Sequence, residues 1–353
     1  MAPAAFMIQF SRAMKRILLA NFGEAPENYH FERALLRALK GRPPDILHDF
    51  DHDYSFIGAG LPPGARRLKY SGLAGLRRLF ALPYDLVILL DFPKRERCAP
   101  GFAWLLREAP AAKKVFVANH LIPMPGDNFC ADLSRRLKLL SRADAGYMLE
   151  FDDRQLWAET GLSGRRLRRR GYASDCVYYA PGKTAAGDYV FSAGSTGRDF
   201  GALAAGVKKC GLALKVFSGS RPPALPRGAQ FLPLSENLHN LKAAAAAARA
   251  VVIPVKDGHV NEAAGNSIAF LSMALGRPVL ARRTRYMAGF IEDGVNGFLY
   301  DELSPAAIGS GLERILALTP ARLARLGAAA RRTILAKASL DRFCAGLLKE
   351  AAR

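Results

Sequence analysis

The chain lacks any apolar run long enough to cross a membrane. A spanning helix needs about 20 consecutive apolar residues, and no stretch of the 353 residues approaches that length. The amino terminus also lacks the continuous apolar core of a secretory signal peptide. We therefore expect a cytoplasmic protein whose first strand begins near Arg16, with residues 1–13 as a flexible leader or an upstream start.

Cysteine is scarce, and its spacing excludes a zinc ribbon. The five cysteines lie far apart, without a C-x-x-C pair and without paired histidines to complete a site. We interpret them as reduced thiols of a cytosolic protein, and we expect neither a metal nor a cofactor. They are Cys98, Cys130, Cys176, Cys210 and Cys344.

Negative charge is also in short supply. The formal net charge is +20. Residues 1–180 hold 28 lysines and arginines against 19 acids, and residues 181–353 hold 23 against 12. An even spread fits an anionic membrane leaflet or anionic substrates better than one nucleic-acid stripe. An arginine- and alanine-rich composition explains the charge equally well. Nothing resembles a nucleic-acid module, so we expect no such partner.

What the chain has is a repeated alternation of short apolar runs and longer stretches of helical period. This alternation is typical of an α/β protein with parallel sheets and crossover helices. In the first half a strand, a loop ending at Gly23 and a helix over 29–40 form a mononucleotide-type unit. Gly41 and Pro43 end that helix. The strands expected there are 16–22, 86–91 and 115–118.

The same alternation restarts after residue 187, which predicts a second domain. Its expected strands are 189–193, 214–217, 251–255 and 278–281. We place one Rossmann-like domain at 1–180, a second at 188–338 and a last helical segment at 339–353. Small and turn-forming residues at 181–187 are typical of a linker.

Three other segments allow less specific interpretations. Residues 45–70 are expected to form a solvated loop, although His48 and His52 stand near aspartates and metal ligation also fits. The arginine-rich run 165–170 is predicted to be solvated or to touch phosphate groups. Leucines within 68–82 fit an interfacial helix and core packing equally well.

Ligands of open parallel sheets collect at the carboxyl ends of the strands, so the loops found there hold the candidate site. After Val255 the chain reaches Gly265, and Asn266 or Ser267 can cap the helix that follows and ends at Gly276. A helix start entered through glycine can bind a diphosphate through its N–H groups and dipole. Many helices are capped in this way without binding a ligand.

Two further loops carry candidate side chains. After Ala193 the chain reads Gly194-Ser195-Thr196-Gly197-Arg198, in which glycines admit a ligand and the arginine can bind phosphate bidentately. A β-turn with a surface arginine fits the same residues. In the first domain His120 follows a strand and can contact a sugar or a developing charge, although a lone histidine is more often structural.

Taken together, these segments resemble glycosyltransferases of the GT-B fold, group 1 (glycogen-synthase-like). The resemblance is strongest from Gly265 to Leu299, where the chain reads Gly-Asn-Ser, then Met-Ala-Leu-Gly-Arg-Pro-Val, then Ile-Glu-Asp-Gly-Val-Asn-Gly-Phe-Leu. It implies two Rossmann-like domains facing each other across a cleft. The second would bind the nucleotide-sugar, the first would receive the acceptor near Gly23, and a helix over 340–351 would cross back to the first.

The resemblance also implies roles and exposes departures. Glu262 stands in for the first of two glutamates that many members carry, while Leu271-Ser272 occupies the place of the second, which holds the ribose. Ser195 replaces the usual arginine, and Arg198 supplies that charge.

From these residues we expect a metal-independent, hexosyltransferase-like enzyme that uses a nucleoside-diphosphate-sugar donor. Its acceptor would be a lipid-linked or cell-envelope glycan, or a protein. The expected donor-binding residues are Gly194, Ser195, Arg198, Gly265, Asn266 and Ser267, and the catalytic ones are His120 and Glu262. A non-catalytic basic scaffold and a nucleotide-sugar epimerase of the same fold are the alternatives.

Overall fold

The computed structural model describes residues 16–23, 26–39, 42–49, 64–93, 95–118, 138–139, 142–148, 167–169, 171–184, 187–195, 197–223, 225–234, 238–257 and 264–352. These residues form two compact units. The division falls between Gly171 and Tyr172, earlier than the predicted boundary at 180, and residues from Asp341 onward belong to the first unit. The segment 181–187, predicted as the linker, therefore falls inside the second unit.

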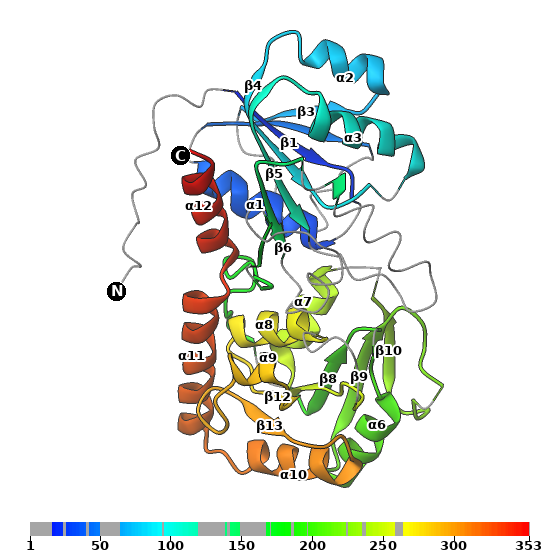
Figure 1. Ribbon diagram of the computed structural model, residues 1–353. Coiled ribbons are helices and arrows are strands. Elements are labelled where there is room, and N and C mark those ends of the chain that lie inside the picture. The colour runs from blue at the N-terminus through cyan, green and yellow to red at the C-terminus, as the bar shows by residue number, and fades with distance from the viewer. Residues whose placement is uncertain are drawn as a thin grey trace. The chain divides into compact units, whose positions relative to one another are not determined.

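The first unit contains a seven-stranded parallel sheet in the order β3-β2-β1-β4-β5-β6-β7 within the described residues (Figure 1). The order reverses between β1 and β4, so their carboxyl ends flank a topological switch point. The strands are β1 (Ile17–Asn21), β2 (Asp45–His48), β3 (Arg66–Lys69), β4 (Tyr84–Leu90), β5 (Ala111–Ala118), β6 (Ala145–Met148) and β7 (Leu167–Arg169).

Helices cover both faces of this sheet. α2 and α3 pack on the face that carries Leu18, Val87 and Phe116. On α1 and α12, Phe31 stacks against Phe343 edge to face. Because the central strands β1 and β4 are buried on both faces, they read as nearly continuous apolar runs. The helices are α1 (Pro26–Leu39), α2 (Leu73–Leu79), the 3₁₀ turn η2 (Glu96–Cys98), α3 (Ala99–Arg107) and α12 (Leu340–Ala351).

One expectation for the first unit is wrong, and the structure bears on two others. The predicted loop 45–70 contains β2 and β3, which pair with β1 and with each other, so backbone pairing overrides the polar composition. Of the two interpretations of 68–82, core packing is confirmed: Leu76 is buried, and Leu68, Leu73 and Leu79 pack against the same core, whereas Leu82 is exposed. The basic run at 165–170 contains β7, which pairs with β6, and its solvation or contact with phosphate groups stays a prediction.

The second unit contains a six-stranded parallel sheet in the order β10-β9-β8-β11-β12-β13 within the described residues (Figure 1). Its strands are β8 (Tyr189–Ala193), β9 (Ala213–Ser218), β10 (Gln230–Pro233), β11 (Ala250–Ile253), β12 (Val279–Arg282) and β13 (Phe298–Tyr300). The sequence patterns predicted four of these strands and missed β10 and β13, which are short and lie at the two edges of the sheet.

Two helix pairs support this sheet. α6 packs against α10, and α8 packs against α11 and on β11 and β12. Arg331 of α11 donates to the carbonyl oxygen of Ala274 at the end of α8, at 2.6 Å, which ties these two helices together. The helices are α6 (Phe200–Lys209), α7 (Leu238–Ala247), α8 (Asn266–Ala274), α9 (Arg285–Ala288), α10 (Pro305–Leu316) and α11 (Pro320–Lys337).

The carboxyl-terminal helix α12 is anchored within the first unit. Arg37 of α1 binds the carboxylate of Asp341 through two hydrogen bonds, at 2.7 and 3.1 Å. The Tyr147 hydroxyl also donates to the Glu350 carboxylate. The segment predicted to return to the first domain is therefore a helix built into that unit.

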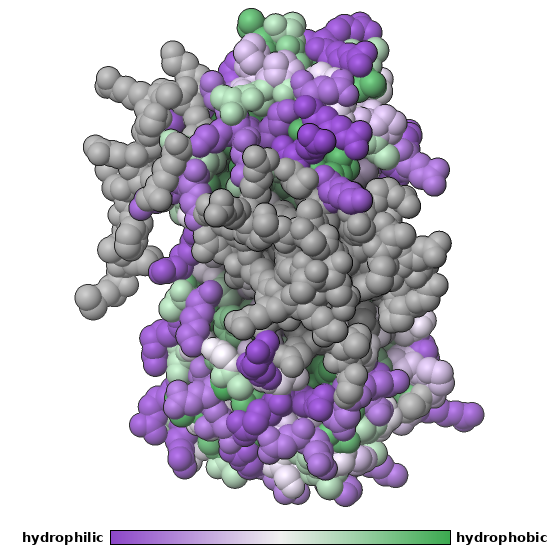
Figure 2. Space-filling view, in the orientation of Figure 1, coloured by the Kyte–Doolittle hydropathy of each residue, from purple (hydrophilic) through white to green (hydrophobic). Residues whose placement is uncertain are grey.

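The surface is hydrophilic over most of the visible described residues of both units (Figure 2). The large hydrophobic side chains exposed among the described residues are Leu82, Val177, Val295 and Leu335. In the part of the chain that is described, no helix is long and apolar enough to span a membrane.

Candidate functional site

Most of the predicted donor-binding residues lie together at the carboxyl edge of the second sheet. Gly194 and Ser195 follow β8, Arg198 lies four residues beyond Gly194, and Gly265 precedes α8. The strand order reverses between β8 and β11, so the ends of these two strands flank the switch point where α/β proteins bind ligands.

The turn after β8 wraps an arginine side chain around a glycine. Gly194 has φ +114°, and a Cβ atom there would lie 2.7 Å from Nη2 of Arg198. The Arg198 Nε group donates to the carbonyl oxygen of Ala193 at 3.3 Å. A side chain at position 194 would therefore displace the guanidinium, and glycine is the residue that the turn requires.

The turn that enters α8 approaches the same arginine from another part of the chain. Gly265 has φ +89°, and a Cβ there would lie 3.1 Å from Arg198 Nη2 and 2.2 Å from Cγ2 of Ile253. The guanidinium of Arg198 thus lies against the backbone of two glycines that are far apart in sequence. The cation is held at the start of a helix.

The structure corrects the predicted cap of α8. Gly265 is the N-cap and Asn266 is the first helical residue, and no side chain within the described residues caps the helix. The first-turn N–H groups therefore lack a side-chain acceptor there and keep the positive end of the helix dipole available. At the other end, Gly276 has φ +72° and its N–H donates to Met273, so the helix stops as predicted.

Asn266 adds an amide to the same turn. Its side chain is 4% exposed, and its Nδ2 atom has no hydrogen-bond partner among the residues that the structure describes. A buried donor without a partner costs about 1–3 kcal/mol, so a ligand acceptor at this position would repay that cost. Ser267 follows it as the second helical residue and is half-buried.

Burial and a tyrosine set the electrostatics of Arg198. Burial lowers the pKa of its guanidinium to about 10, and the nearby Tyr300 partly opposes that shift. Arg198 therefore remains a cation at neutral pH, in surroundings less polar than water. Burial likewise raises the pKa of Tyr300, which keeps that hydroxyl protonated.

Ser195 lies slightly apart from this centre. Its hydroxyl accepts from the N–H of Gly219 at 2.7 Å and lies 3.3 Å from the hydroxyl of Ser218, so it ties the end of β8 to the end of β9. Its observed contacts thus close a loop, and contact with a ligand would come in addition to them.

Gly23 lies in the first unit, at the carboxyl end of β1. Its N–H donates to the Oδ1 atom of Asn21, and a Cβ there would lie 2.7 Å from Nδ2 of Asn28 and 3.1 Å from Cβ of Asp91. Close packing alone therefore explains the glycine. The two predicted catalytic residues, His120 and Glu262, lie outside the described residues.

Sequence reasoning missed two contributors to the second-unit edge. Tyr300, the last residue of β13, donates its hydroxyl to the carbonyl oxygen of Ile253 at 2.8 Å. Arg282, the last residue of β12, forms an ion pair with Asp257 at 2.8 Å. Tyr300 directly follows the Gly-Phe-Leu of the recognised signature. Its place next to that signature was the one sequence feature that could have pointed to it.

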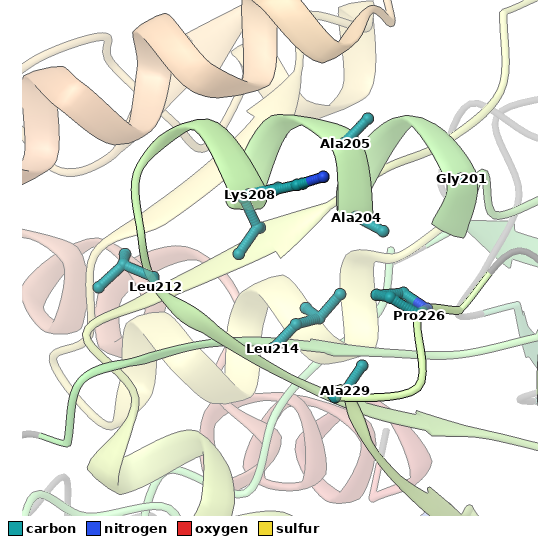
Figure 3. A pocket seen from close by; sticks show the side chains of 10 residues that line it. Gly201, Ala204, Ala205, Lys208, Leu212, Leu214, Pro226 and Ala229 are labelled. Atoms are coloured by element: carbon teal, nitrogen blue, oxygen red, sulfur yellow. The ribbon is translucent and has the colours of Figure 1, made fainter.

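Two other features lie away from this edge. An apolar groove of about 340 Å³ runs between α6 and the chain entering β9 and β10, with Lys208 as its one charged lining residue among those described (Figure 3). It contains none of the predicted site residues. Near His48, as elsewhere in the described part of the chain, no group of three side chains is arranged to hold a metal ion.

Comparisons with known proteins identify the fold. No protein-family model matches the chain, and no curated protein matches it in sequence. Among solved structures, sucrose-phosphate synthase from Thermosynechococcus elongatus is 15% identical, with a TM-score of 0.67 over 95% of this chain and 98% of its own. HepE from Anabaena, in complex with UDP and glucose, is 13% identical, with a TM-score of 0.66 over 96% and 98%.

A glycosyltransferase from Rickettsia africae gives a similar match. It is 11% identical, with a TM-score of 0.65 over 96% of this chain and 99% of its own. These likenesses extend over nearly the whole length of both partners. The chain has the GT-B fold with two Rossmann-like domains, as the sequence resemblance implied.

Proposed function

We propose that the chain is a glycosyltransferase that moves a sugar from a nucleoside-diphosphate-sugar to an acceptor. The supporting observation is the position of Arg198, whose guanidinium lies against Gly194 and Gly265 at the start of α8. A partly buried cation beside a helix N-terminus is suited to bind a diphosphate. The fold adds a second support, since the similar structures named above include several glycosyltransferases.

The reaction requires stabilisation of the leaving nucleoside diphosphate. Arg198 can offer a forked pair of hydrogen bonds, and the first turn of α8 can offer N–H groups and the helix dipole. Groups fixed in advance around developing charge lower the barrier without reorganisation. We propose that these groups suffice without a metal ion, so activity should persist in excess chelator.

The donor class is proposed on the same basis. HepE has been crystallised with UDP and with UDP-glucose, which is a property of that protein. Because the fold is shared and the arginine lies at the strand ends, we propose a nucleotide-sugar donor for this chain and UDP as the first nucleotide to test.

The proposed roles of individual residues follow the geometry. Arg198 and the turn of Gly265, Asn266 and Ser267 bind the phosphates, while Gly194 admits them and Ser195 shapes the loop. His120 beside the sugar and Glu262 as a catalytic residue in the place of the first glutamate remain proposals from the sequence resemblance. Gly23 remains proposed on the acceptor side.

A second candidate function is favoured by one observation. Leu271 replaces the acid that would hold the donor ribose, and it is 5% exposed within α8, where it forms part of the core. A chain that has lost this acid could keep the fold as a non-catalytic binding protein. Such a protein would turn over no donor with any acceptor.

We further propose that the acceptor is a lipid-linked or cell-envelope glycan, or a protein, met at the inner face of a membrane. The support is the net charge of +20, which is spread over both halves of the chain. Co-sedimentation with vesicles containing anionic lipid, but not with purely zwitterionic vesicles, is the expected result. Equal pelleting with both kinds of vesicle contradicts it.

Titration calorimetry tests the donor proposal. The full chain is titrated with UDP, GDP, ADP, CDP and dTDP, and then with the sugar conjugates of whichever nucleotide binds. We expect one nucleotide to bind in the micromolar range and its conjugate to be hydrolysed slowly or transferred. Absence of binding by all five nucleotides contradicts the proposal, and conversion of the donor sugar without an acceptor would indicate an epimerase.

A further inference from the structure

Tyr300 connects two strand ends of the second sheet. It ends β13, and its register partner on β12 is Arg282. Its hydroxyl donates to the carbonyl oxygen of Ile253, the last residue of β11, at 2.8 Å. Since β12 lies between β11 and β13, the tyrosine side chain reaches past the end of one whole strand.

The carbonyl that receives this hydrogen bond closes a tight turn. The N–H of Val255 also donates to the Ile253 oxygen, at 3.1 Å, so the chain turns within three residues after β11. The phenol is 5% exposed, so its hydrogen bond is shielded from competing water. Tyr300 therefore fixes the conformation of the segment that follows β11.

That segment holds the main chain of Arg198. Val255 and Arg198 form an antiparallel bridge. The N–H of Asp199 donates to Pro254 and the N–H of Lys256 donates to Gly197, both at 2.8 Å. Any shift of the turn after β11 must consequently move the backbone that carries the arginine.

The entrance of α8 rests on the same residue. A Cβ on Gly265 would lie 2.2 Å from Cγ2 of Ile253, which means that the glycine backbone is in direct contact with this side chain. Ile253 thus supports the helix entrance with its side chain and the arginine turn through its neighbours. Tyr300 holds the carbonyl oxygen of this shared residue.

We propose that Tyr300 is a positioning residue that holds Arg198 and the entrance of α8 at a fixed separation, so that the site prefers a diphosphate to a monophosphate. A diphosphate can meet the guanidinium with one phosphate and the helix N–H groups with the other. A monophosphate has only one phosphate group to share between them, so it gains less from their fixed separation. The inference rests on the proposed function, since it concerns the same site.

The test compares Tyr300→Phe with a matched control. Tyr189→Phe removes a similar hydrogen bond. Tyr189 is 8% exposed, and its hydroxyl donates to the carbonyl oxygen of Ala244 at 2.7 Å. Unlike Tyr300, it lies at the start of β8, at the opposite end of the sheet. Calorimetry measures the affinity of each variant for the nucleoside diphosphate that binds the wild-type chain and for its monophosphate.

We expect Tyr300→Phe to weaken diphosphate binding about tenfold, as for loss of one buried hydrogen bond, and to change monophosphate binding less than twofold. Tyr189→Phe should leave both affinities unchanged. An equal loss for both nucleotides, an unchanged preference, or failure of the Tyr300→Phe chain to fold overturns the inference, because each indicates a merely structural residue. If the wild-type chain binds no nucleoside diphosphate, the proposed function fails as well, which distinguishes the two failures.

Discussion

The carboxyl edges of the two sheets differ in the residues that line them and in how their polar groups are hydrogen-bonded. In the first unit, Asn21 donates to Glu32 at 2.7 Å and accepts from Asn28 and Gly23 at 3.2 Å, so buried polar side chains satisfy one another. In the second unit, glycine turns surround one arginine, and the helix start has no side-chain cap among the described residues. The first edge is closed by its own hydrogen bonds, whereas the second presents donors for a ligand.

This difference indicates at which edge an anion can bind without breaking hydrogen bonds that stabilise the fold. A network of mutually bonded amides and carboxylates loses stability when one member turns to a ligand. An uncapped helix start and a buried cation gain stability from a bound anion instead. Substitutions at the two edges should therefore separate stability from binding.

The largest effect is expected at Gly265. Gly265→Ala requires a non-glycine residue at φ +89° and places a methyl group 2.2 Å from Cγ2 of Ile253. We expect the free energy of unfolding to fall by about 3–4 kcal/mol, from backbone strain together with overpacking. Gly211→Ala is the control, since φ is +67° there but nothing lies within 4 Å. It should cost only about 1 kcal/mol, and equal losses in urea unfolding would disprove the steric argument.

The next effect concerns binding rather than stability. Arg198→Ala removes the partly buried cation, and we expect about a hundredfold loss of nucleoside-diphosphate affinity, typical of a lost charge-assisted contact. Loss of the hydrogen bond from Nε to the Ala193 carbonyl should cost about 1 kcal/mol of stability, so the chain should still fold. Arg283→Ala, which breaks a surface pair with Asp301, is the control and should change nothing. Calorimetry that finds unchanged affinity in Arg198→Ala refutes the assignment.

At the carboxyl edge of the first sheet we expect the reverse, a loss of stability without a loss of nucleotide affinity. Asn21→Leu removes the donor to buried Glu32 and the acceptor for Asn28 and Gly23. We expect the unfolding free energy of the first unit to fall by about 2 kcal/mol, while nucleotide affinity stays within twofold of wild type. A large loss of nucleotide affinity would show that this edge takes part in donor binding.

The smallest expected effect is a pH dependence of stability, confined to the first unit, which comes from Asp45. Burial raises the pKa of Asp45, but hydrogen bonds from Arg66 and Tyr84 outweigh burial and leave that pKa below its ordinary value of 3.8. The carboxylate therefore adds stability above about pH 4, and this contribution is lost as the pH falls through the lower folded value.

Asp45→Asn should cost about 1 kcal/mol at pH 7, since Arg66 is largely exposed, and little at pH 2. Asp301→Asn in the second unit changes an exposed ion pair and serves as the control. It should leave the free energy of unfolding unchanged at both pH values. Urea unfolding at the two pH values measures the difference. An equal cost of Asp45→Asn at both contradicts the linkage.

The sequence predicted central structure better than peripheral structure. The strands at 189–193 and 251–255 were found because both faces of a central parallel strand are buried, which leaves an unbroken apolar run. β3 was missed because Arg66 and Lys69 are exposed on an edge strand, where only the backbone needs to pair. The N-cap of α8 was assigned to the wrong residue, because glycine and asparagine are both good caps and the backbone angle decides between them.

The residue types at the candidate site were predictable, but their arrangement was not. Glycines and an arginine placed after predicted strands were enough to nominate Gly194, Arg198 and Gly265. Tyr300 could not be nominated, because its function depends on reaching the carbonyl of Ile253 across another strand. Contacts of this kind join residues nearly fifty positions apart, and no local pattern records them.

By itself the sequence determined the alternation of strands and helices, the two Rossmann-like domains and the glycines at the strand ends, because periodicity and backbone freedom are local properties of the chain. Only the tertiary structure decided that the last helix, which was expected to return to the first domain, is tied there through Asp341 and Glu350. It also decided that one partly buried guanidinium lies against two distant glycines. The physical reason is that burial and close approach depend on which segments pack together, and packing is settled by the whole fold.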